Sequence, residues 1–164
     1  MRDPEKQGDG MVIVPYVDGY LLKEDVRETF HHARIHNIPY MAGCTMDDLG
    51  TTPEDQAQHS PGMLLQENKS FCEGVKVMLD QDAWCYLFSR ELPGENGRGD
   101  TAFHSSELWY TFGTLGRCWR PMEERDFALS REMVEAWTNF MKTGNPGNGW
   151  KPCTKEDPQV KDFC

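Results

Sequence analysis

The sequence has 164 residues and a formal net charge of −10. This length suits one ordinary domain, and the aromatic share of 11%, with five tryptophans, indicates a folded chain because such side chains supply much of the area that a core buries. The acidic balance excludes a sequence-independent grip on nucleic acid or on an anionic membrane surface, since both require clustered Lys and Arg.

The chain begins with a charged, polar segment. Residues 1–10 (MRDPEKQGDG) do not resemble a signal peptide, so we expect a flexible lead-in there and one domain over residues 11–164. No apolar run reaches the length of a membrane span. The compartment stays open on this basis, with the cytoplasm favoured.

The first predicted elements are a small hairpin and a helix. The strand-like run MVIVPYV over 11–17 ends at an Asp-Gly turn signal, and the apolar residues YLL follow it. The next segment, residues 23–35, places Val26, Phe30 and Ala33 on one helical face.

Two buried strands with a helix between them come next. NIPYMAGCT over 37–45 predicts a strand that runs into a loop with two adjacent aspartates. Ser70 and Glu73 have the spacing of a capping box ahead of an apolar face, so we expect a helix to begin there. AWCYLFS over 83–89 is the clearest strand in the chain.

A long amphipathic helix follows within residues 123–147 and ends near Gly144 and Pro146. Its expected apolar stripe consists of Phe127, Met133, Val134, Trp137, Phe140 and Met141. The order helix, strand, helix, strand, helix predicts an α/β fold with a mainly parallel sheet.

Candidate catalytic residues lie just after the two predicted strands, where parallel sheets carry their chemistry. Asp47 and Asp48 follow the first strand, and His104 lies in GDTAFHSSELWYTFG (99–113), beyond the second. A carboxylate that orients an imidazole, and an imidazole that moves a proton, are two members of a nucleophilic triad, here in the α/β-hydrolase order acid then histidine. The pattern alone leaves open whether His104 is catalytic or an ordinary residue at an element boundary.

The histidine segment resembles the histidine motif of the type-B carboxylesterase family, which includes the para-nitrobenzyl esterases and the cholinesterases. In that family a loop rich in glycine, alanine and polar residues presents the catalytic histidine, and Glu-Leu and an aromatic–Phe–Gly motif follow. Here these are His104, Glu107-Leu108 and Tyr110–Gly113.

The acid segment NIPYMAGCTMDDLG resembles the acid motif of the same family. Gly43, Thr45 and Asp47 fall on their counterparts, and Asp48 takes the place of the catalytic acid, which is usually a glutamate. Asp47 is then expected to be a loop residue or hydrogen-bond partner. VPYVDGYLL and MVEAWTNFMKTGNPG also match the flanking segments, so the resemblance covers nearly the whole chain in order.

The resemblance implies the C-terminal part of an α/β-hydrolase fold, with an incomplete, mainly parallel sheet and packing helices. It implies a carboxylic ester as substrate, His104 as the general base and acid, Asp48 as its orienter, and no cofactor. The insert between acid and histidine strands, residues 49–82, is shorter than is usual in the family and implies a more open pocket.

The family's nucleophile elbow, Gly-x-Ser-x-Gly, does not occur in these residues, nor does its oxyanion-hole Gly-Gly loop. We therefore expect no esterase activity from the chain alone. The incomplete sheet predicts pairing with the missing N-terminal half or with a second copy, because an open strand edge invites another strand. The alternatives are a non-catalytic cholinesterase-like binding module, the remnant of a truncated gene, or an unrelated small α/β domain.

The remaining candidate residues carry weaker indications of function. Trp109 is a tentative substrate contact because it lies beside the histidine motif, although core packing is the commoner role. Glu107 is expected to act structurally at the start of the next helix. His32 and His36 have the spacing of a metal pair but no third ligand, so no metal site is predicted. The six cysteines form no zinc pattern and are expected to be reduced.

Overall fold

The computed structural model describes residues 15–94 and 99–164. The chain forms two compact units, Met1–His36 and Asn37–Cys164. The predicted lead-in, residues 1–10, lies outside the described residues.

The described part of the first unit contains a turn where a hairpin was predicted. Residues 15–22 form no strand, and the rest of the predicted strand over 11–17 lies outside the described residues. The Asp18 carboxylate accepts hydrogen bonds from the amides of residues 20–22 at 2.8–3.0 Å. This local turn satisfies the backbone without a partner strand, so the predicted hairpin is wrong over these residues.

The helix of the first unit, α1 (Val26–His31), is shorter than predicted. The Asp25 carboxylate caps its first turn by accepting from the Arg27 amide at 2.9 Å. Ala33 adopts the left-handed region at φ +52°, so the helix has already ended where the predicted apolar face continued.

The second unit is built on a three-stranded parallel sheet, with β1 (Tyr40–Thr45), β2 (Ala83–Phe88) and β3 (Val160–Phe163) in that spatial order. β1 and β2 were predicted, and β3 was missed. Its four residues include two charged side chains and only one buried residue, so it lacks the apolar run that marked the other two.

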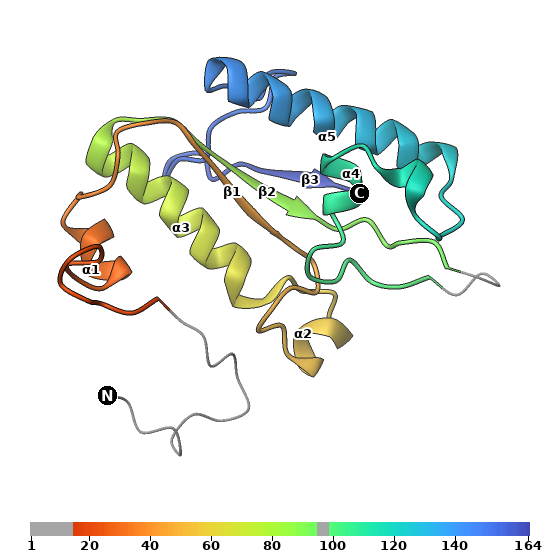
Figure 1. Cartoon of the computed structure of the whole chain (residues 1–164), viewed down its shortest axis with the longest axis horizontal. Helices are drawn as coiled ribbons and strands as arrows, with labels where there is room; N and C mark the ends of the chain where they lie inside the picture. The colour runs from red at the N-terminus through yellow and green to blue at the C-terminus, as the bar shows by residue number, and fades with distance from the viewer. Residues whose placement is uncertain (1–14, 95–98) are drawn as a thin grey trace. The chain divides into compact units, whose positions relative to one another are not determined.

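One long helix covers each face of this sheet, as Figure 1 shows for α3 and α5. The Tyr40 ring packs edge-on against Phe71 of α3 at 5.3 Å, while the Tyr86 ring packs against Trp137 of α5 at 5.0 Å. Tyr86 also lies over Gly43 of β1, where a Cβ would stand 2.4 Å from its ring atoms. Glycine is therefore required at that point of β1.

The helix α3 (Gly62–Leu79) begins eight residues before the predicted start. Ser70 and Glu73 lie inside it and do not cap it, so the capping-box prediction is wrong. Residues 63–69 (MLLQENK) are mostly strong helix formers, and they extend the helix back to Pro61.

A short helix, α2 (Pro53–Ala57), occupies part of the segment expected to be a polar loop. Thr52 and Asp55 form its capping box, in which each side chain bonds the backbone amide of the other. The segment between β1 and β2 thus folds as α2 and α3.

The predicted long helix is confirmed as α5 (Glu124–Thr143), and Gly144 ends it in the left-handed conformation at φ +75°. Met133 is buried and Trp137 is partly buried against the core, as the stripe predicted. Met141 is 76% exposed, so the stripe is wrong at its C-terminal end. The core cluster lies between α5, the end of β2 and the segment that follows it, and consists of Phe88, Leu92, Ala102, Tyr110, Leu115, Leu129, Met133 and Phe163.

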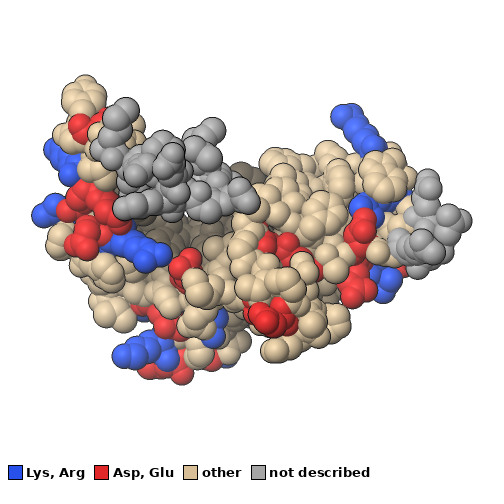
Figure 2. Space-filling model, turned by 90° about the horizontal axis from the view of Figure 1, so that it is seen from below, with Lys and Arg blue, Asp and Glu red and all other residues tan. Residues whose placement is uncertain are grey.

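Acidic and basic side chains lie in small interspersed groups on the face of the molecule that Figure 2 shows. This distribution is that of an ordinary solvated surface, and the excess of acids is spread over it. In the described ranges, no helix combines the length and the hydrophobicity that crossing a membrane requires.

Candidate active site

Two predicted site residues meet at the carboxyl end of the sheet. Asp48 lies three residues after β1, and His104 lies in the segment that follows β2. Nδ1 of His104 is 2.5 Å from Oδ1 of Asp48. The structure thus brings together the acid and the histidine although 56 residues separate them along the chain.

Asp48 is held from three directions. Its Oδ2 accepts a hydrogen bond from the Thr45 amide at 2.9 Å, and its Oδ1 accepts one from the Leu49 amide at 2.7 Å. Burial alone would raise the pKa of this carboxyl, but the two amides, and then His104, outweigh it and keep the pKa below its usual value. Asp48 is therefore a fixed, ionised carboxylate at neutral pH.

His104 is open to the surroundings on its other side. Its side chain is 54% exposed, whereas that of Asp48 is 8% exposed. With Nδ1 bound to the carboxylate, Nε2 is the ring nitrogen left for proton transfer. The pair has the arrangement of a general base with its orienting acid.

Backbone contacts tie the histidine segment to the acid loop. The Asp47 amide donates to the Ala102 carbonyl at 2.9 Å, and Asp47 forms an isolated parallel bridge with Phe103. Asp47 thus connects the two loops through its backbone, while Asp48 contacts the imidazole. Ser105 turns the chain after the histidine in the left-handed region, at φ +70°.

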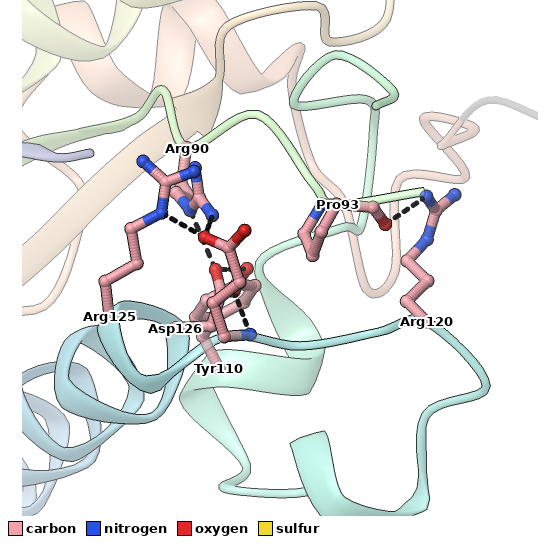
Figure 3. A network of polar contacts seen from close by, with 7 residues as sticks. Arg90, Pro93, Tyr110, Arg120, Arg125 and Asp126 are labelled. Carbon is pink, nitrogen blue, oxygen red and sulfur yellow. Dashed lines mark hydrogen bonds and ion pairs between the residues drawn. The ribbon is translucent and has the colours of Figure 1, made fainter. Parts of the chain in front are cut away.

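A buried polar network fixes α4 (Leu108–Thr111), the short helix after the histidine, to the start of α5 (Figure 3). Oδ1 of Asp126 accepts from the Tyr110 hydroxyl and from Nε of Arg90, both at 2.7 Å. Ser130 of α5 donates to the Tyr110 carbonyl at 2.8 Å. Burial works to raise the pKa of Asp126, but Arg90, the Glu123 amide and the hydroxyl hold it below its usual value.

This network was not predicted from the sequence. Arg90 follows β2 and Asp126 lies in the first turn of α5, 36 positions further along the chain. No spacing rule joins such residues, and only the fold brings them into contact.

Glu107 is placed at the start of α4, as predicted, but it makes no capping hydrogen bond. Among the described residues, its buried Oε2 has no hydrogen-bond partner. Burial raises the pKa of this carboxyl, and the charge of Asp48 raises it further. The pKa values of the neighbouring Asp48 and Glu107 carboxyls are thus shifted in opposite directions.

Trp109 packs within the unit. Its ring lies edge-on to that of Phe103, with centroids 6.2 Å apart, and it contacts the core cluster. Substrate contact by Trp109 stays a prediction.

No group of three His, Cys, Asp or Glu side chains within residues 15–94 and 99–164 is arranged to hold a metal ion. Nδ1 of His32, one of the two histidines considered for such a site, lies 3.2 Å from a Glu24 carboxylate oxygen. The six cysteines are free thiols, of which Cys44, Cys72, Cys85 and Cys153 are buried.

Comparison with known proteins identifies the family of the chain. Residues 70–163 match the carboxylesterase family, a stretch that includes His104 and more than half of the chain. The chain belongs to the carboxylesterase family. The bile salt-activated lipase of Bos taurus is 35% identical to this carboxylesterase-family chain over an alignment of 63 residues, which covers 34% of the chain and 11% of the lipase.

Solved esterases share its fold. A para-nitrobenzyl (PNB) esterase superposes with a TM-score of 0.72 at 19% identity, over 92% of this chain and 39% of that one. An esterase of Clostridium hathewayi, described as able to hydrolyse aliphatic aromatic polyesters, gives a TM-score of 0.58 at 23% identity, over 70% of this chain and 23% of the esterase. The predicted fold class, the C-terminal part of an α/β-hydrolase with an incomplete sheet, is confirmed.

The chain spans 11% of the curated lipase and 23–39% of these two solved esterases. The chain therefore corresponds to only a part of each of these relatives.

Proposed function

We propose that this chain supplies the acid and the histidine of a serine-type carboxylic ester hydrolase, with Asp48 orienting His104. The observation that carries the proposal is the 2.5 Å contact between His104 Nδ1 and an Asp48 carboxylate that two backbone amides already fix. Membership of the carboxylesterase family supports an ester as the substrate.

The pair suits both halves of ester hydrolysis. Nε2 of His104 accepts the proton of a serine hydroxyl as its oxygen attacks the ester carbonyl, and the imidazolium then protonates the departing alcohol. Water, deprotonated by the same nitrogen, next releases the acid from the acyl-enzyme. Asp48 stays ionised throughout and stabilises the imidazolium.

The serine comes from outside these 164 residues, because they contain no Gly-x-Ser-x-Gly. The proposal therefore includes a partner segment that carries the nucleophile and the oxyanion-hole amides. Without them His104 has no hydroxyl to activate, and the chain alone is inactive.

Two features support a partner segment that packs against the sheet and its helices. β1 pairs with β2 along one edge, and no other described strand pairs with it. An apolar groove of about 330 Å³ lies between β2, α4 and α5, and it is lined in part by Tyr86, Phe112, Trp137 and Met141. Phe112 is 72% exposed there, which is unusual for a phenylalanine and suits a surface that a further segment covers.

The test compares the 164-residue chain with the same chain joined to whatever the coding sequence places before it. We expect no hydrolysis of a p-nitrophenyl ester by the chain alone, and hydrolysis once a segment with Gly-x-Ser-x-Gly is attached. Hydrolysis by the chain alone, abolished by His104→Ala, would contradict the proposal.

The alternative function is a non-catalytic binding module or a gene remnant, which the absence of the nucleophile motif from these residues favours. Preceding coding sequence without a Gly-x-Ser-x-Gly would favour this alternative. Its presence, in the same frame or in a neighbouring one, would favour the enzyme.

A further inference from the structure

We propose that Arg120 is a positioning residue that holds the segment carrying His104 against the acid loop. This inference rests on the proposed function, since it concerns the geometry of the Asp48–His104 pair. Arg120 contacts neither residue, so its role is to place the segment and not to react.

Arg120 connects the two ends of the segment, residues 93–100, that precedes the histidine loop. Its side chain is only 4% exposed. Nη1 donates to the Pro93 carbonyl at 3.2 Å, as Figure 3 shows, and Nη2 bonds the Asp100 carboxylate. Leu92 and Asp100 exchange two backbone hydrogen bonds of 2.8 and 2.9 Å at the same place. Arg120 thus joins both sides of the excursion between β2 and the histidine.

The same guanidinium packs among aromatic rings that flank the histidine. It lies 5.7 Å from the centroid of Phe103, the residue just before His104, and 5.9 Å from that of Trp109 on α4. It lies 4.6 Å from Trp119. A cation attracts the faces of aromatic rings, more strongly where water is excluded. One buried group therefore contacts the chain on both sides of the catalytic candidate.

A path of direct contacts leads from Arg120 to the Asp48–His104 pair. Phe103, which packs on the guanidinium, forms the bridge with Asp47, the neighbour of Asp48. Loss of the cation frees this segment to move relative to the acid loop. Displacement of a reacting group by about 1 Å is enough to lower a rate on the order of 10²-fold.

Lysine cannot replace the guanidinium fully. It keeps the charge that pairs with Asp100, but it lacks the planar group that stacks on rings and bonds two acceptors at once. Arg120→Lys is therefore the conservative variant, and Arg120→Met removes the charge while it keeps a long apolar stem.

The test follows the hydrogen-bonded imidazole proton of His104 by NMR of the 164-residue chain. A proton held between Nδ1 and a carboxylate resonates far downfield of the amides, and the loss of that signal in His104→Gln assigns it. We expect Arg120→Met to lose the signal and Arg120→Lys to show a weakened one. In Arg120→Met the Asp48 carboxyl, followed by its carbon shift, titrates at higher pH than in the wild type, because one of its stabilising hydrogen bonds is gone.

The control variant is Leu129→Ala, which removes a buried side chain of the core cluster on α5 and leaves Arg120 and its hydrogen-bond partners in place. Each protein is measured at the same interval below its own melting temperature. Leu129→Ala should keep the downfield signal.

The outcomes separate the two proposals. A wild-type signal in Arg120→Met, or in Arg120→Lys should the methionine variant not fold, overturns the positioning role alone. Equal loss in Leu129→Ala also overturns it, since general destabilisation would then explain the effect. A wild-type protein without the signal contradicts the Asp48–His104 pair, and with it both proposals.

Discussion

At the scale of single residues, the site depends on two carboxyls whose surroundings differ. Asp48 has backbone amides to stabilise its charge, whereas Glu107 is buried with one oxygen unpaired among the described residues. The first is kept ionised and the second is pushed toward its neutral form. Their effects on stability should therefore depend on pH in opposite directions.

Glu107→Gln tests this difference. The folded-state pKa of Glu107 lies above its unfolded value, so the native protein loses stability as pH rises through that range. We expect the neutral glutamine to raise the melting temperature by about 2–4 °C at pH 7, which corresponds to about 1 kcal/mol. The gain should vanish below pH 4, where both states of the wild type are protonated.

The measurement is the melting temperature of the wild type and of Glu107→Gln from pH 3 to 8. Asp48→Asn is the contrasting variant. The pKa of the wild-type Asp48 carboxyl is lower in the folded than in the unfolded protein, so this carboxyl stabilises the fold above its unfolded-state pKa. That stability is lost as pH falls through the folded-state pKa. A gain from Glu107→Gln that is constant with pH would show that the charge of Glu107 is not its cause.

Tyr110→Phe tests the network between α4 and α5. The change removes one hydroxyl that donates to the buried Asp126 carboxylate at 2.7 Å. We expect a loss of about 2 kcal/mol in the free energy of unfolding, as for a hydrogen bond to a charged group. Tyr20→Phe, at a side chain that is 89% exposed, is the control and should change nothing in urea unfolding. Equal effects of the two changes would contradict the account.

At the scale of elements, the sheet depends on the fit of Tyr86 over Gly43. Gly43→Ala would place a methyl 2.4 Å from the Tyr86 ring and from its backbone oxygen, so β1 must shift away from β2. We expect a loss of about 3 kcal/mol, at the upper end of typical overpacking. The control is Gly116→Ala, where a Cβ meets no atom within 4 Å. The measurement is the free energy of unfolding of both variants in denaturant. Similar values for Gly43→Ala and Gly116→Ala would contradict the close fit of Tyr86 over Gly43.

Sequence patterns predicted the elements whose signal is local and strong. β2 and α5 were predicted because an apolar run and a 3.6-residue stripe mark them, and the loops after β1 and β2 pointed to Asp48 and His104. β3 and the true start of α3 were missed, since a short mixed strand has no distinctive pattern and a chance capping-box spacing misplaced the helix.

The supporting contacts of the site were beyond prediction for a different reason. Arg90 with Asp126, and Arg120 with Asp100, join residues 36 and 20 positions apart. Such pairs depend on how α5 and the segments after β2 pack together, which no local spacing encodes.

At the scale of the whole molecule, we propose that the chain is one part of a larger catalytic arrangement. It belongs to the carboxylesterase family yet spans 39% of a para-nitrobenzyl esterase of the same fold. Its acid and histidine occupy adjacent loops at the open end of the sheet, next to the edge of β1 where further strands can pair. We therefore propose that it supplies the proton-transfer half of the site.

The proposed function is tested most directly by the rate of p-nitrophenyl ester hydrolysis. The protein measured is the chain joined to the segment that its own coding sequence places before it, where that segment carries a Gly-x-Ser-x-Gly. We expect His104→Ala to lower kcat by about 10³-fold or more, since the base that activates the nucleophile is lost. A kcat that His104→Ala leaves unchanged would contradict it.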